Sequence, residues 1–179
     1  MMTVENVAEN GAEKAAEIAE SLDIRRLSGS LGAEVRGLSL AEAGPEEARQ
    51  IESLLMEHQV LFFPDQYLSP DSHIAFGELF GELESHPHLS LGGERPEFFE
   101  LRAFGGKGAI ADEWHSDLTC QEQPSVIAIL HMVKCPAVGG DTMWANMYKA
   151  FEELTPPMRH FCEGLSALHD AHPHGHPEN

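Results

Sequence analysis

Residues 125–133 form an almost continuous apolar run, Ser-Val-Ile-Ala-Ile-Leu-His-Met-Val. Val126, Ile127, Ile129 and Val133 are β-branched, and such side chains favour the pleated backbone of a sheet over a helix. A short apolar run of this kind is typical of a strand that is buried on both faces. The sequence therefore predicts a buried strand at 125–133, and so a fold that contains a β-sheet.

Patterns before and after this run predict further elements. Pro45, followed by two glutamates, suits the first turn of a helix, and Ser69-Pro70-Asp71 is a second helix start. One face of the first helix carries apolar residues at helical spacing: Ala48, Ile51, Leu54, Leu55 and His58. Strands are expected at 24–27, 34–38, 60–63 and 98–104, and helices from Pro45, at 70–80, at 147–154 and shortly after Pro157. These elements predict a mixed α+β fold, mainly β.

The composition restricts the classes of partner and the compartment. The chain has 179 residues and a net charge of -19, which repels a phosphate backbone and argues against nucleic acid. Its cysteines, Cys120, Cys135 and Cys162, contain no CxxC pair, which argues against a disulfide framework or a zinc-thiolate site and fits a reducing compartment. No signal peptide and no apolar stretch of bilayer length are found. We therefore expect a cytoplasmic protein that binds no membrane.

The pattern along the chain divides it into three regions. In residues 1–23, glutamates recur every four positions among alanines, and like charges at that spacing weaken a helix; this region is expected to be an acidic flexible tail. Residues 24–170 are expected to form one domain. Residues 171–179 are rich in His, Pro and Gly and are expected to be a second flexible tail.

The strongest chemical signal is the triplet His115-Ser116-Asp117. In an extended chain, side chains two residues apart point to the same side, so one imidazole and one carboxylate can bind a single ion from one direction. They would supply two of the three ligands of a 2-His-1-carboxylate facial triad, which leaves open positions on iron(II). The competing interpretation is a surface turn in which Asp117 bonds its own backbone.

The order of sequence blocks around this triplet favours the metal site. Trp114-His115-Ser116-Asp117 is followed by the apolar run and then by Gly-Gly-Asp-Thr-Met-Trp-Ala-Asn at 139–146. Val-Leu-Phe-Phe-Pro-Asp-Gln at 60–66 and Phe-Gly-Glu-Leu-Phe-Gly at 76–81 precede it. Together these blocks resemble the TauD/TfdA (taurine dioxygenase) family of iron(II)- and 2-oxoglutarate-dependent oxygenases, over roughly residues 24–170.

The resemblance implies a fold, a co-substrate and site residues. The fold would be part of a double-stranded β-helix, a cupin-like jelly roll, with flanking helices. His115 and Asp117 would bind Fe(II), and Thr142, after two turn-forming glycines, would hydrogen-bond 2-oxoglutarate. His86 would contact the substrate, and no catalytic residue is expected beyond the metal ligands. The implied reaction is hydroxylation by O2 of a small organic molecule, for which a sulfonate or alkyl sulfate is expected.

Family members continue beyond this point, and their later part carries a second iron histidine and an arginine that pairs with 2-oxoglutarate. Arg159 lies on an expected helix and suits a solvated or packing role. Tail histidines could substitute as ligands (His169, His172, His174 and His176), although a flexible tail is the simpler interpretation. An alternative is therefore a catalytically inactive truncated fragment that acts at most as a binding or interaction module, and a homo-oligomer could cover its exposed strand edges. A cupin-like binding protein would share the His-x-Asp strand but would not require Thr142 and its glycines.

Overall fold

The computed structural model describes residues 22–84, 98 and 114–169. The chain divides into two compact units. The first contains residues 1–82 and 131–154, and the second contains residues 83–130 and 155–179. Of the predicted elements and regions, the strand at 98–104 (apart from residue 98) and most of the two tails lie outside the described residues.

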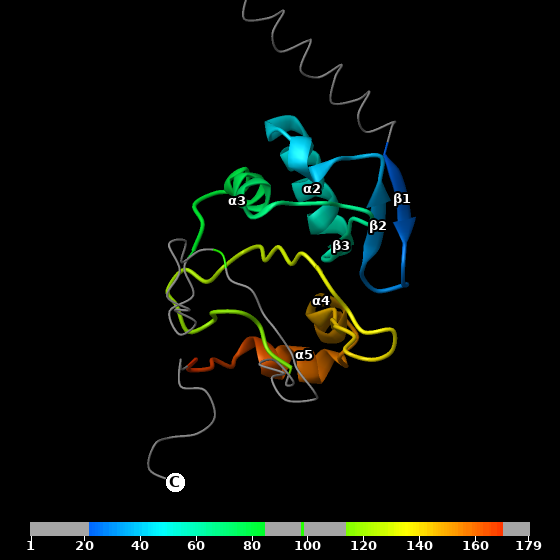
Figure 1. The fold of residues 1–179 in the computed structure, drawn as a ribbon. Coiled ribbons are helices and arrows are strands. Elements are labelled where there is room, and N and C mark those ends of the chain that lie inside the picture. Colours follow the sequence, from blue (N-terminus) through cyan, green and yellow to red (C-terminus); the bar gives the residue numbers. More distant parts are fainter. Residues whose placement is uncertain (1–21, 85–97, 99–113, 170–179) are drawn as a thin grey trace, which may run out of the picture. The chain divides into compact units, whose positions relative to one another are not determined.

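The first unit contains a three-stranded sheet in the order β1-β2-β3 (Figure 1). Strands β1 (Asp23–Arg26) and β2 (Ala33–Arg36) form an antiparallel hairpin, and β3 (Leu61–Phe62) runs parallel to β2. The turn of the hairpin is held by Ser28, whose Oγ accepts hydrogen bonds from the backbone N–H groups of Ser30 (3.2 Å) and Leu31 (3.1 Å). A hydroxyl that satisfies backbone donors in this way is a common device for closing a turn.

Helix α2 (Pro45–His58) follows the hairpin and the short 3-10 helix η1 (Leu40–Glu42). Its start is stabilised by Glu47, whose Oε2 accepts a hydrogen bond from the N–H of Gly44 at 2.9 Å. The helix ends at Gln59, which adopts the left-handed conformation with φ 60°. Ala48, Ile51 and His58 are buried, as the helical spacing in the sequence predicts.

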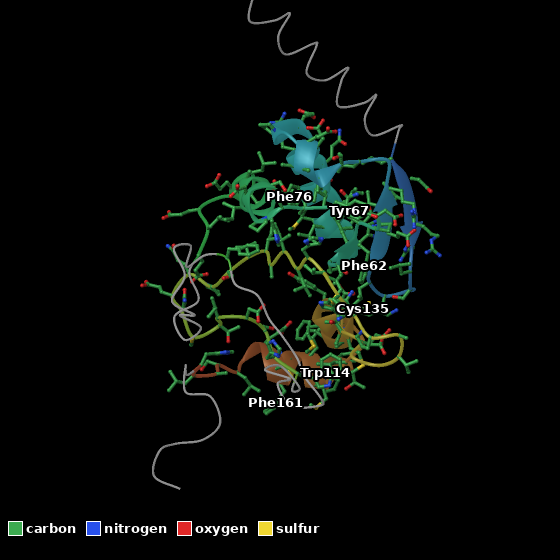
Figure 2. All side chains as sticks on the ribbon, viewed as in Figure 1. Phe62, Tyr67, Phe76, Trp114, Cys135 and Phe161 are labelled. Carbon is green, nitrogen blue, oxygen red and sulfur yellow. The ribbon has the colours of Figure 1, made fainter. Side chains whose placement is uncertain are left out.

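The core of the described residues lies in the first unit. Its buried apolar side chains come from β2, η1, α2 and α3: Ala33, Val35, Leu40, Ala48, Ile51 and Phe76. Helix α3 (Pro70–Glu78) contributes Phe76, which is labelled in Figure 2. The ring of Phe76 packs edge-on against the ring of Phe80, with centroids 5.2 Å apart. Ser69 caps α3 through a 3.1 Å hydrogen bond from the Ser72 N–H to its Oγ. The strands and helices predicted up to residue 80 are therefore confirmed, with ends that shift by one or two residues.

Two short helices are described in the C-terminal part of the chain. Helix α4 (Met147–Glu152) belongs to the first unit and α5 (Pro156–Glu163) to the second. Both were expected from the sequence, and α4 is two residues shorter than the predicted 147–154. None of the helices in the described ranges has the length and apolar character needed to cross a bilayer.

The predicted strand at 125–133 is wrong. These residues form neither strand nor helix, and Val126, Leu130 and Val133 are 86%, 64% and 78% exposed. Exposure alternates from Val126 to Met132, which is the two-residue period of an extended chain. A strand also needs a neighbour that accepts and donates its backbone hydrogen bonds, and the sheet of the described residues contains only β1, β2 and β3. For the same reason, the predicted predominance of β structure is not seen in the described residues.

Candidate functional site

His115 and Asp117 approach each other in the second unit. Residues 114–116 carry no regular structure and lead directly into a turn at 117–120. The Nε2 atom of His115 lies 3.3 Å from Oδ1 of Asp117, and the two side chains are 51% and 60% exposed. The two-residue spacing therefore brings one imidazole nitrogen and one carboxylate oxygen together at a surface that solvent reaches.

The turn after Asp117 is tight. Leu118 has a φ of +50°, a left-handed conformation that is uncommon for a residue with a side chain. The Gln121 N–H donates to the Leu118 carbonyl at 3.0 Å. The hydroxyl of Thr119 lies 2.8 Å from Nδ1 of His169, which follows α5 in the same unit. These contacts order the backbone next to the His115–Asp117 pair.

The separation within this pair fits a shared metal ion. Two ligand atoms, each about 2.1 Å from one ion and at right angles to each other, lie about 3.0 Å apart. The observed 3.3 Å between Nε2 and Oδ1 requires only a small adjustment. One nitrogen and one carboxylate oxygen also form a donor set that suits first-row divalent metals such as iron(II). No group of three or more His, Cys, Asp or Glu side chains able to hold a metal is found within 22–84, 98 and 114–169.

Thr142 lies in the first unit, in a segment from 139 to 146 without helix or strand. Gly139 and Gly140 have φ values of +82° and +76°, a conformation that glycine adopts without steric cost. These φ values agree with the use of glycine at both positions, and Thr142 is exposed. The structure thus brings His115 and Asp117 together, while Thr142 belongs to the other unit and His86 lies outside the described residues.

The remaining sequence candidates have other environments. Arg159 is half-buried on α5, a position in keeping with a packing role. His169 contacts Thr119, and His172, His174 and His176 lie outside the described residues.

Two contacts of the 139–146 segment were not predicted. The ring of Trp144 packs edge-on against Phe62 of β3, with centroids 5.4 Å apart (84° between the planes). The side chain of Asn146 bonds Ser30 in the hairpin turn and Gln59 at the end of α2. The sequence offers one relevant signal, because asparagine directly before a helix is a common N-cap, but it says nothing about the two distant partners.

The comparisons with known proteins all match this chain to one family of dioxygenases. Residues 23–179 match the sequence model described as "Taurine catabolism dioxygenase TauD, TfdA family". The chain is 38% identical over 165 residues to the alpha-ketoglutarate-dependent sulfate ester dioxygenase of Pseudomonas putida. The matched region covers 89% of this chain and 53% of that protein. It is also 38% identical over 152 residues to the alkylsulfatase of Acinetobacter baylyi, covering 84% of this chain and 47% of that protein.

A solved structure gives the same result for the fold. A taurine dioxygenase from Burkholderia xenovorans superposes with a TM-score of 0.62 at 30% identity, over 80% of this chain and 51% of that one. The fold is therefore of the taurine dioxygenase type. The chain spans about half the length of the curated relatives that it matches.

Proposed function

Because this chain belongs to the taurine catabolism dioxygenase TauD, TfdA family, we propose that it acts as an Fe(II)- and 2-oxoglutarate-dependent dioxygenase. The observation that carries the proposal is the 3.3 Å separation of His115 Nε2 and Asp117 Oδ1, at exposed side chains that an ion can reach. In this proposal both residues bind iron. The positions that they leave open would admit the co-substrate and O2.

Each site residue has a definite task. The neutral imidazole of His115 and the carboxylate of Asp117 hold the ion from one side, and the Asp117 charge offsets part of the charge of the metal. The hydroxyl of Thr142 donates a hydrogen bond to a carboxylate oxygen of 2-oxoglutarate, and the turn at Gly139 and Gly140 presents it. When bound, the metal supplies the chemistry by which O2 hydroxylates a C–H bond while 2-oxoglutarate is converted to succinate and carbon dioxide.

We propose a sulfate ester or a sulfonate as the substrate. This choice is supported by the two relatives at 38% identity, which are named as a sulfate ester dioxygenase and an alkylsulfatase. Hydroxylation of the carbon next to the ester oxygen gives a product that collapses to an aldehyde and sulfate. His86 would contact the anionic head group, since a positively charged or hydrogen-bonding imidazole suits a sulfate oxygen.

We also propose the architecture of the sheet to which the described strands belong. The described sheet and helices would belong to a double-stranded β-helix, supported by the likeness to taurine dioxygenase structures. A cytoplasmic location is supported by the three cysteines, which are all free thiols.

The test is a reaction of the purified chain with Fe(II), 2-oxoglutarate, O2 and an alkyl sulfate. Succinate and sulfate should form in equal amounts, and succinate formation should stop when iron is replaced by a redox-inert metal such as zinc. Taurine in place of the alkyl sulfate, with sulfite as the product, compares the two substrate classes. A chain that binds neither Fe(II) nor 2-oxoglutarate would instead support the binding-module alternative.

A further inference from the structure

The side chain of Asn146 joins three elements of the first unit. Its Nδ2 group donates to the Ser30 carbonyl in the hairpin turn (2.5 Å) and to Oε1 of Gln59 at the end of α2 (3.1 Å). Its Oδ1 accepts from the N–H of Lys149 at 2.9 Å, which caps α4. One amide therefore ties the end of the 139–146 segment to residues that lie 116 and 87 positions earlier in the chain.

The partners of Asn146 are themselves fixed. Gln59 donates from Nε2 to the carbonyls of Met56 (3.3 Å) and Glu57 (3.1 Å), so its Oε1 is oriented as an acceptor. The Gln59 N–H bonds the Leu55 carbonyl at 2.7 Å, which closes the end of α2. Asn146 is consequently bonded to a rigid helix end and not to a loose surface side chain.

A second anchor lies two residues earlier. Trp144 is in edge-on contact with Phe62, and Phe62 is paired in the sheet with Glu34. The 139–146 segment has no helix or strand of its own, so its position depends on anchors of this kind. Thr142 lies between the Gly139-Gly140 pair and these two anchors in the sequence.

We propose that Asn146 is a positioning residue for 2-oxoglutarate, because it fixes the segment that carries Thr142. This inference rests on the proposed function, in which Thr142 bonds that co-substrate. Asn146 does not itself touch the ligand. A displaced hydroxyl weakens a hydrogen bond steeply with distance and angle, so loss of the anchor should weaken 2-oxoglutarate binding without affecting the metal ligands His115 and Asp117.

The two tasks of Asn146 can be separated by substitution. Asn146→Asp keeps an oxygen that caps α4, and aspartate is as good an N-cap as asparagine. It replaces the Nδ2 donor by a second oxygen that faces the Ser30 carbonyl and Gln59 Oε1, so attraction becomes repulsion. Asn146→Ala removes both tasks. Ser69→Ala removes the cap of α3 in the same unit and serves as the matched control.

The experiment measures hydrogen–deuterium exchange of peptides covering 139–146 and the dissociation constants of Fe(II) and 2-oxoglutarate under anaerobic conditions. Asn146→Asp should raise exchange in this segment and weaken 2-oxoglutarate binding about tenfold, with unchanged Fe(II) affinity. Asn146→Ala should do the same, and Ser69→Ala should change neither quantity.

Two outcomes would overturn the inference in different ways. Asn146→Asp with the exchange and the 2-oxoglutarate affinity of the unaltered chain would show that Asn146 is no anchor. If the unaltered chain fails to bind 2-oxoglutarate in the presence of Fe(II), the proposed function fails, and the ligand role of Asn146 fails with it. The exchange data distinguish these cases, because they report on the anchor whether or not the co-substrate binds.

Discussion

The Nε2 atom of His115 and the Oδ1 atom of Asp117 lie 3.3 Å apart on the surface of the second unit. A segment without regular structure and the turn at 117–120 are enough to bring them together. No packing around the pair is required, since both side chains are more than half exposed. Local backbone geometry therefore accounts for these two of the three proposed metal ligands.

Replacement of Asp117 should remove metal binding and leave the fold intact. Asp117→Ala deletes a charged ligand at an exposed position, where substitutions usually change stability by less than about 0.5 kcal/mol. We expect Fe(II) affinity, measured by anaerobic calorimetry, to fall at least about tenfold, with an unchanged thermal midpoint by circular dichroism. Glu122→Gln, at an exposed carboxylate five residues away, is the control and should bind Fe(II) as the unaltered chain does. Unchanged affinity in Asp117→Ala would remove that carboxylate from the site.

Truncation of Val35 should destabilise the first unit. Val35 is 1% exposed in β2, and Val35→Ala removes two buried methyl groups and leaves a cavity, at a cost of about 2 kcal/mol. Urea denaturation followed by circular dichroism measures the change. Val138→Ala makes the same chemical change at a side chain that is 91% exposed, and it should alter the free energy of unfolding by less than about 0.5 kcal/mol. Equal effects of the two substitutions would contradict the assigned core.

Loss of the α3 cap should also be measurable. Ser69→Ala removes the Oγ that accepts from the Ser72 N–H, and such a loss costs about 1 kcal/mol. The same substitution at Ser53, an exposed position within α2, should be slightly stabilising, because alanine has the higher helix propensity. Opposite signs in urea denaturation are therefore expected for the two serine-to-alanine variants.

The hairpin should respond to pH through Glu34. Hydrogen bonds from Arg36 Nε (2.8 Å) and Arg25 Nη2 (3.0 Å) hold the pKa of the Glu34 carboxyl below its usual value. Its contribution to stability is therefore present above the pKa of the unfolded chain, and it is lost as the pH falls through the lowered pKa of the folded chain.

The measurement is the thermal midpoint of Glu34→Gln against the unaltered chain between neutral and acid pH. The variant should melt at a lower temperature at neutral pH, and the difference should shrink as the pH falls. Glu52→Gln, at an exposed position on α2, should show a smaller difference at neutral pH. A Glu34→Gln difference that grew on acidification would show that this carboxylate does not stabilise the fold.

Elements with a complete local signal were predicted well. Helix α2 has a proline start, a glutamate that caps its first turn and apolar residues at helical spacing, and all three features act within a few residues of one another. The same holds for Ser69 at α3. The pairing of His115 with Asp117 is local in the same sense, which is why a three-residue motif could indicate it.

The 125–133 segment shows where local signals fail. Its apolar, β-branched composition indicated an extended chain, and the alternating exposure from Val126 to Met132 agrees with that. Pairing in a sheet depends on a second segment, which the sequence of 125–133 does not specify. Asn146 is the complementary case, since its two distant partners, Ser30 and Gln59, could not be read from its neighbours.

The amino-acid sequence by itself determined the turns, the helix ends, the apolar faces and the His-x-Asp pair, because each of these arises from interactions among neighbouring residues. Only the tertiary structure decided which strands pair, which apolar side chains are buried, and that Asn146 and Trp144 hold the Thr142 segment against the sheet and α2. These outcomes depend on contacts between residues far apart in the chain, whose free energy is set by the geometry of the whole unit and not by any short stretch of sequence.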